Sequence, residues 1–416
     1  MSSENIEISR LANGVRVVSE TVTHVQSVSV GIWVGAGSRG EETSERGITH
    51  FIEHMLFKGT ERRTARQIAD EIESRGGSLN AFTDKEYTCY YAKALAEHVD
   101  IVMDVLSDML RHSVLDPEEL AREQNVVLEE IKRYKDTPDD TIHDIFLQTL
   151  WSSHPLGRPV IGVEKTVGAI RRQDIIDYMS SNYTPDRIVV SVSGAVPHAL
   201  VVELAEKFLG SMSGAPKTFR SKAPISSGKS KHVRKKTEQV HFCYGSNAYP
   251  QLNDKRYALT LLDSVLGGNM SSRLFQEIRE KRGLAYSIGS YNVAYREGGL
   301  FTIYGGTSPD TFEEVLDLTR TEISKVKREN VSEDEVSKAK NQIRGALILG
   351  LENMSSRMMR MGKNLLYFDR VIPISEIRTK IEAVTMDDLS NVAHHIFDES
   401  QMTLTSIGPT RKSEAE

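Results

Sequence analysis

Cysteine is scarce in this sequence, with only Cys89 and Cys243 among 416 residues. So few cysteines exclude a disulfide-stapled secreted scaffold and a cysteine-ligated zinc module. Positive charge is not in excess either, because 52 basic and 58 acidic residues give a net charge of −6. The chain therefore lacks the global positive field that holds nucleic acid or an anionic membrane, and we expect neither as a partner. No segment approaches the run of about 18 apolar residues that a membrane-spanning helix needs.

The N-terminus also lacks a recognisable targeting signal. Residues 1–7 are polar and acidic, without a basic segment or an apolar core, and strand-like sequence begins at Val15. Hydrophobic residues make up 39% of the chain and charged residues 26%, the balance of a globular protein with a full core. We therefore expect a cytoplasmic protein, and a mature organellar chain would look the same.

A polar segment divides the chain near its middle. The sequence from Ser211 to Lys236 is rich in Ser, Gly, Pro and basic residues, and aromatic residues do not alternate with its charges as they do in nucleic-acid patches. We interpret 213–236 as a basic linker between a first domain, 1–212, and a second domain, 237–416.

The two domains are expected to be copies of one unit. Each contains alternating strand-like sequence (79–94 and 286–304), then an amphipathic helix (97–111 and 309–328), then a second helix that begins at Asp116 or Ser332. This order predicts an α+β fold with two homologous domains. When Asp116 is aligned with Ser332, the acids Glu123 and Glu130 fall opposite alanines, so only the first copy carries polar chemistry.

A possible metal site begins with His50, Glu53 and His54, which follow the pattern His-x-x-Glu-His. Residues four apart stack one turn apart on a helix, so both imidazoles can reach one ion, with Glu53 on the same face. Two imidazoles, a carboxylate and an open position make a catalytic zinc site. A solvated charged face is the alternative, and the apolar residues interleaved with the motif argue against it.

The third ligand must come from elsewhere in the chain, and Glu130 is the best candidate. It lies seven residues after Glu123 on the helix expected from Asp116 to Tyr134, so both acids face the same way. The neighbouring Glu129 points about 100° away. Glu123 would then orient a histidine or the helix itself.

Together these residues resemble the inverted zinc motif of the inverzincins, and more narrowly the pitrilysin, insulinase and mitochondrial processing peptidase family. The likeness extends over nearly the whole chain, including its two halves. It implies half of a clamshell, in which each domain is a mostly antiparallel sheet with packed helices. It also implies one Zn²⁺ per chain, bound by His50, His54 and Glu130, with Glu53 as general base and Glu123 in a supporting role.

The same resemblance extends to two further segments. Residues 76–83, Gly-Gly-Ser-Leu-Asn-Ala-Phe-Thr, resemble the edge strand to which a peptide substrate adds as one more strand, with Asn80, Ala81 and Phe82 as contacts. Residues 279–286 resemble the arginine–tyrosine pair of the family. Tyr286 would then donate to the developing oxyanion, and Arg279, ranked above Arg282, would hold substrate carbonyls.

The resemblance finally implies a zinc-dependent endopeptidase that cuts unfolded peptides or oligopeptides in an enclosed chamber. Larger relatives join four such domains, so a homodimer is the simplest arrangement, and a heterodimer with a metal-free homologue stays open. Two other functions are possible. One is a non-catalytic structural subunit, whose relatives have lost metal-site residues that stand here, and the other is a processing peptidase subunit with a separate partner.

Overall fold

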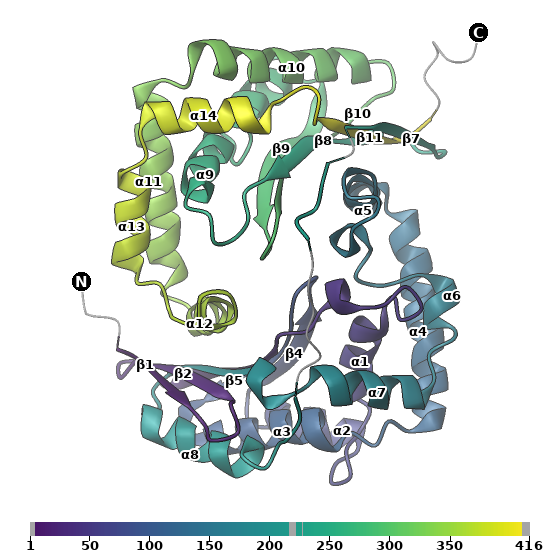
Figure 1. The fold of residues 1–416 in the computed structure, drawn as a ribbon, viewed down its shortest axis with the longest axis vertical. Coiled ribbons are helices and arrows are strands. Elements are labelled where there is room, and N and C mark those ends of the chain that lie inside the picture. The colour runs from purple at the N-terminus through teal and green to yellow at the C-terminus, as the bar shows by residue number, and fades with distance from the viewer. Residues whose placement is uncertain (1–4, 216–221, 227, 410–416) are drawn as a thin grey trace. The chain divides into compact units, whose positions relative to one another are not determined.

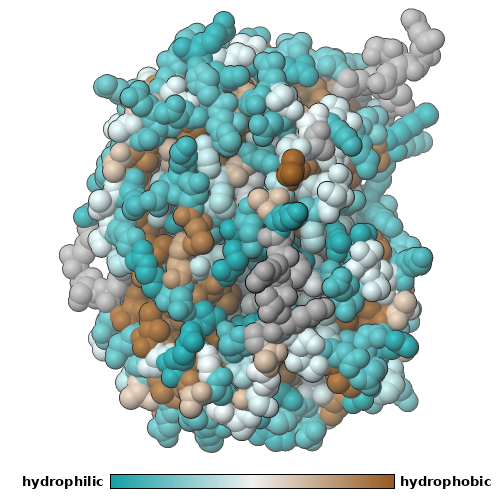
Figure 2. All heavy atoms as spheres, viewed as in Figure 1, coloured by the Kyte–Doolittle hydropathy of each residue, from teal (hydrophilic) through white to brown (hydrophobic). Residues whose placement is uncertain are grey.

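The computed structural model describes residues 5–215, 222–226 and 228–409. The chain forms two compact units, and each is built from more than one segment. The first unit contains Met1–Lys132, Pro159–Arg220 and Ile348–Pro373, and the second contains Arg133–Arg158, Ser221–Leu347 and Ile374–Glu416. Among the described residues, no helix has the length and apolar character of a membrane span. Hydrophilic residues cover most of the face drawn in Figure 2.

A six-stranded sheet forms the centre of the first unit, in the order β1-β2-β6-β3-β5-β4. Figure 1 labels β1, β2, β5 and β4 of this sheet. Its neighbours are antiparallel except for the parallel pair β2 and β6. The strands are β1 (Ile6–Arg10), β2 (Arg16–Thr21), β3 (Ser27–Val34), β4 (Ser78–Thr83), β5 (Thr88–Leu95) and β6 (Ile188–Gly194).

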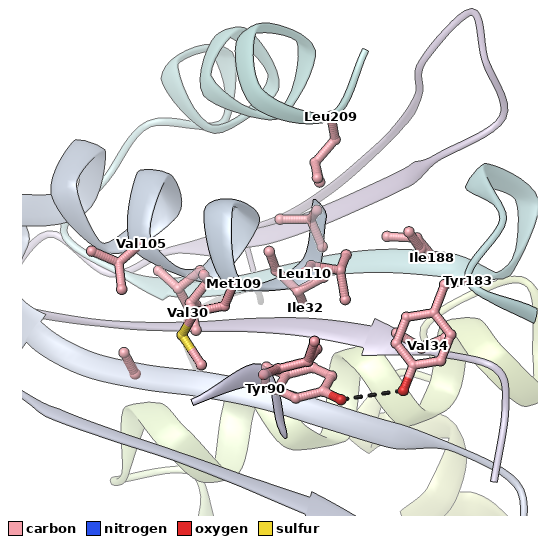
Figure 3. Packing of buried hydrophobic residues seen from close by; sticks show 14 of the residues in the cluster. Val30, Ile32, Val34, Tyr90, Val105, Met109, Leu110, Tyr183, Ile188 and Leu209 are labelled. Carbon is pink, nitrogen blue, oxygen red and sulfur yellow. Dashed lines mark hydrogen bonds between the residues drawn. The ribbon is translucent and has the colours of Figure 1, made fainter. Parts of the chain in front are cut away.

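Side-chain alternation along β3 explains why helices cover both faces of this sheet. Val28, Val30, Ile32 and Val34 point to one face, where they pack with α3 (Val99–His112) and α8 (His198–Leu209). Figure 3 shows this core. It includes a hydrogen bond of 3.2 Å between the hydroxyl of Tyr90, which lies on β5, and the hydroxyl of Tyr183, which follows α7. The first unit also contains α1 (Ile48–Leu56), α2 (Ala65–Glu73), α6 (Glu164–Val167), α7 (Arg172–Asn182) and most of α4 (Pro117–Asp136).

The opposite face of the sheet is covered by a helix from much later in the sequence, α12 (Met354–Phe368). Met358 and Met361 of α12 pack with Trp33 of β3 in a separate buried cluster. The helix approaches the sheet closely, because a Cβ atom at Gly362 would lie 2.1 Å from the Nε1 atom of Trp33. The Ser191 hydroxyl of β6 also donates to the Met358 carbonyl at 2.8 Å.

The second unit repeats this plan with a five-stranded sheet, in the order β7-β11-β8-β10-β9. Its first pair is parallel and the others are antiparallel, as in the series β2-β6-β3-β5-β4. The strands are β7 (Ser230–Arg234), β8 (Val240–Ala248), β9 (Ala285–Ala294), β10 (Gly299–Thr307) and β11 (Thr403–Gly408). The predicted α+β fold with two similar, mostly antiparallel domains is thus confirmed.

Helices again cover both faces of the second sheet. On one face lie α9 (Lys255–Leu266), α10 (Phe312–Glu329) and α14 (Met386–Ile396), while α5 (Pro138–Leu150) covers the other. Like α12, α5 comes from the other half of the sequence. The unit also contains α13 (Ile374–Glu382), most of α11 (Glu333–Gly350) and a π-helix at Phe275–Glu280.

The predicted domain boundaries, 1–212 and 237–416, stay a prediction. They place α5 in the first domain and α12 in the second, because each helix lies in that half of the sequence. The contacts instead assign each helix to the other unit. Part of the segment interpreted as a linker, 213–236, is also ordered as β7 and pairs with β11. Residues 216–221 and 227 of that segment lie outside the described residues.

Candidate metal centre and catalytic residues

Helix α1 carries the His-x-x-Glu-His motif, and a buried carboxylate fixes where this helix begins. Glu41 accepts hydrogen bonds from the amides of Gly47 at 2.8 Å and Thr49 at 3.0 Å, which have no partner within the helix. Gly47 adopts a φ of +92°, which favours glycine. Burial raises the pKa of Glu41 to about 7, while its bonds to the two amides and to Thr49 lower it.

Burial of five apolar side chains then sets the rotation of α1. Its buried apolar residues leave His50, Glu53 and His54 on a half-buried face; they are Ile48, Phe51, Ile52, Met55 and Leu56. This is the amphipathic division that the sequence predicts for the motif. The face contacts α4 through His54 and Glu130, and β4 through Glu53 and Thr83.

The structure brings His50, His54 and Glu130 together. The Oε2 atom of Glu130 lies 3.6 Å from Nε2 of His54 and 4.0 Å from Nε2 of His50. One ligand atom from each residue falls within 4.8 Å of the others. Ligands at about 2.0–2.2 Å from a tetrahedral zinc ion lie about 3.3–3.6 Å apart. Two imidazoles and a carboxylate are donor types that zinc takes, and the 3.6 Å between Glu130 and His54 matches this spacing, while the 4.0 Å between Glu130 and His50 is longer.

The protonation state of His50 suits a metal ligand. Its burial lowers the pKa of the imidazole to about 4, with a smaller contribution from the positive charge that His54 can carry. His50 is thus neutral at physiological pH, the form in which imidazole binds a metal. Its Nδ1 atom is buried and has no hydrogen-bond partner among the described residues.

The second ring nitrogen of His54 contacts Glu123, as the sequence suggested for a supporting acid. The Oε2 atom of Glu123 lies 3.1 Å from Nδ1 of His54, while Oε1 lies 2.6 Å from Nζ of Lys58. Glu123 is buried on α4. The Lys58 contact was not part of the expected site, although position 58 lies one turn beyond His54.

Glu53 lies on the same face of α1 and is held from the neighbouring strand. The hydroxyl of Thr83, the last residue of β4, donates to Oε2 of Glu53 at 2.5 Å. Burial is the largest effect on Glu53 and raises its pKa. The hydrogen bond from Thr83 and the charge of His54 lower this pKa, while the charge of Glu130 raises it further. Sequence reasoning gave Thr83 no role. Its place at the end of the proposed substrate strand was the only available signal.

Strand β4 is the outermost strand of the first sheet, next to β5. Asn80 is exposed, and its side-chain oxygen accepts a hydrogen bond from the amide of Ala81 at 2.8 Å. Ala81 packs against the core beneath α1 and α3, whereas the Phe82 ring packs edge-on to Trp33 on the other face, at 5.8 Å between centroids. The three predicted contact residues therefore lie on an edge strand, which pairs with β5 on one side and with no other strand of the described residues.

Arg279 and Tyr286 lie in the second unit and contact each other. The Arg279 guanidinium donates to the Tyr286 carbonyl at 2.8 Å and sits 4.7 Å from the centre of its ring. Tyr286 is 78% exposed. Arg282, the lower-ranked candidate, forms an ion pair with Glu277 at 2.8 Å. The contact between Arg279 and Tyr286 is thus formed entirely within the second unit.

Two family models match this chain. Residues 16–164 match the model described as insulinase, peptidase family M16, and residues 169–343 match the model described as peptidase M16 inactive domain. The first match includes His50, His54 and Glu130, and the second includes Arg279 and Tyr286.

Relatives of similar length carry names that agree with these matches. A Bacillus subtilis protein named uncharacterized zinc protease YmxG is 41% identical over 96% of this chain and 97% of its own length. A Rickettsia felis protein named uncharacterized zinc protease is 39% identical over 98% of both chains. The crystal structure of a Helicobacter pylori protease shares the fold, with a TM-score of 0.91 at 23% identity, over 98% of this chain and 100% of that one. The chain described here therefore belongs to the insulinase family of peptidases, family M16.

Proposed function

We propose that this protein is a zinc-dependent endopeptidase that hydrolyses unfolded peptides or oligopeptides. The observation that carries the proposal is the cluster of His50, His54 and Glu130 with Glu53 on the same face of α1. The names of the relatives support zinc and proteolysis. Residues 169–343 match the family model described as an inactive domain. This agrees with the second half of the chain, which has alanines in the places of Glu123 and Glu130.

The chain's own residues would divide the work as follows. His50, His54 and Glu130 would hold zinc, which supplies Lewis acidity toward the scissile carbonyl and lowers the pKa of a water molecule. Glu53 would accept a proton as that water adds to the carbonyl carbon, and pass it to the amine when the C–N bond breaks. The Thr83 hydroxyl donates to Oε2 of Glu53, and Oε1 would carry this transfer.

Substrate would be held along β4 as an added strand. Main-chain hydrogen bonds to the strand edge supply affinity with little demand on sequence, which suits a peptidase for unfolded chains. Tyr286 would donate to the developing oxyanion and Arg279 would hold substrate carbonyls. We propose that a homodimer forms the enclosing chamber, as the family resemblance implies.

Cleavage of a quenched fluorescent peptide library, measured together with zinc content, tests this function. We expect the parent to bind one zinc per chain and cleave, and Glu53→Gln to keep zinc but lose activity by at least about 100-fold. His54→Ala should lose both. Glu129→Gln is the matched control, since Glu129 is exposed on α4 and pairs with Lys132 instead. A parent without zinc and without cleavage would refute the peptidase and favour a structural subunit.

A further inference from the structure

A continuous series of polar contacts extends from the proposed metal site to a lysine. Nζ of Lys58 lies 2.6 Å from Oε1 of Glu123, and Oε2 of the same carboxylate lies 3.1 Å from Nδ1 of His54. Nε2 of His54 then faces Glu130 at 3.6 Å. Each oxygen of Glu123 therefore has a different partner, and Lys58 contacts the oxygen that the histidine does not use.

The series has little freedom to rearrange. The Glu123 side chain is 6% exposed, and the Lys58 side chain is 29% exposed. Lys58 lies two residues beyond the end of α1, where its amide donates to the Met55 carbonyl at 3.1 Å, while Glu123 belongs to α4. The ion pair thus joins the end of the motif helix to the helix that carries Glu130. A buried carboxylate with one oxygen fixed by an ammonium group keeps its other oxygen in a defined direction.

The two histidines of the cluster differ in what orients them. Nδ1 of His50 has no hydrogen-bond partner among the described residues, so packing alone sets the direction of that ring. His54 is less buried than His50, with side chains 23% and 14% exposed, and relies on Glu123. Carboxylates that bind the free nitrogen of a ligating histidine fix its tautomer and its orientation.

We propose that Lys58 is a positioning residue of the metal site, which strengthens zinc binding by holding Glu123 against His54. The inference rests on the proposed zinc site and adds a residue to it. Lys58 touches neither the ion nor the substrate, and it acts through Glu123 alone. Its direct electrostatic effect has the opposite sign, because a positive charge near a divalent cation weakens binding. The direction of the change therefore separates positioning from simple charge repulsion.

Zinc affinity, measured by competition with a chromophoric chelator, tests the inference without any reference to cleavage. The variants are Lys58→Met, which keeps the length of the side chain, Lys58→Arg, Glu123→Gln and the double variant Lys58→Met/Glu123→Gln. Lys132→Met is the matched control, since Lys132 lies on the same helix as Glu123 and pairs with the exposed Glu129. Melting temperatures of the metal-free proteins show that each variant is folded.

We expect Lys58→Met to weaken zinc binding about tenfold and Glu123→Gln about 10- to 100-fold, the range for partners of zinc ligands. The double variant should bind no more weakly than Glu123→Gln, because Lys58 has no other route to the site. Lys58→Arg should recover most of the loss, and Lys132→Met should match the parent. In the cobalt-substituted proteins, the visible absorption bands should shift in Lys58→Met and not in Lys132→Met.

Three results would overturn the proposal. Unchanged or tighter binding in Lys58→Met would show that the lysine positions nothing. Additive losses in the double variant would show that it acts independently of Glu123. A parent that binds no zinc would refute the metal site itself, and with it the proposed function, whereas the first two results leave that function standing.

Discussion

The close approach of α12 to the first sheet makes Gly362 a position where one methyl group is costly. A Cβ atom there would lie 2.1 Å from Nε1 and 2.4 Å from Cε2 of Trp33. The indole is 1% exposed and is packed against Phe82 and Tyr87, so it has no space into which to move. Overpacking of this kind costs about 1–3 kcal/mol, and at this distance we expect the upper end.

Helix propensity opposes this cost, because alanine is better than glycine inside a helix by about 1 kcal/mol. The net prediction for Gly362→Ala is a loss of about 1–2 kcal/mol from the free energy of unfolding of the first unit. At Gly345, inside α11 of the second unit, an added Cβ atom would meet no heavy atom within 4 Å apart from its chain neighbours and the backbone of its own helix. The same substitution there should stabilise by about 0.5–1 kcal/mol.

Guanidinium unfolding followed by tryptophan fluorescence can separate the two effects. The chain has two tryptophans: Trp33 belongs to the first unit and Trp151 to the second. A Trp151→Phe background therefore reports the first unit, and a Trp33→Phe background reports the second. If Gly362→Ala proved as stable as its background, the steric reasoning would be wrong. Destabilisation by Gly345→Ala would contradict the propensity argument.

Two more predictions concern the proposed catalytic base, Glu53, and an ion pair in the second unit. Thr83→Val should lower kcat about tenfold with zinc content unchanged, because Glu53 loses its fixing bond, and Thr83→Ser should restore the rate; equal kcat in all three would refute this role. Arg273 holds the pKa of Glu335 at about 2, below the value near 4.5 in the unfolded chain. The pair therefore stabilises the fold above about pH 4.5, and this contribution disappears as the pH falls toward 2. Melting temperatures of the metal-free parent and Arg273→Gln should differ at pH 7 and converge at low pH, and a constant difference would contradict the assignment.

The sequence predicts much of the candidate metal centre because local geometry determines it. Helical spacing is enough to place His50, Glu53 and His54 on one face, and the seven-residue interval does the same for Glu123 and Glu130. The acid-bearing helix, expected from 116 to 134, is observed at Pro117–Asp136. Such features depend on the period of a helix and on nothing remote in the chain.

Contacts between remote elements were not predictable in this way. The bond from Thr83 to Glu53 depends on how β4 lies beside α1, and a one-residue shift of the strand would remove it. The apolar faces of α5 and α12 show that each helix is buried, but hydropathy does not say against which sheet. Strand β7 was missed because its polar, basic sequence is that of a sheet edge, where half of the backbone is unpaired.

The exchange of α5 and α12 has a consequence for cutting the chain. Proteolysis between residues 213 and 229 would sever the polypeptide, yet each fragment would still contain a helix that packs against the other fragment's sheet. The nicked protein should therefore stay associated, and the two fragments should fold when produced together. Either fragment produced alone would expose one bare apolar sheet face, which includes Trp33 in the first and Cys243 in the second. Each half of the chain thus supplies a helix that covers an apolar sheet face of the other half.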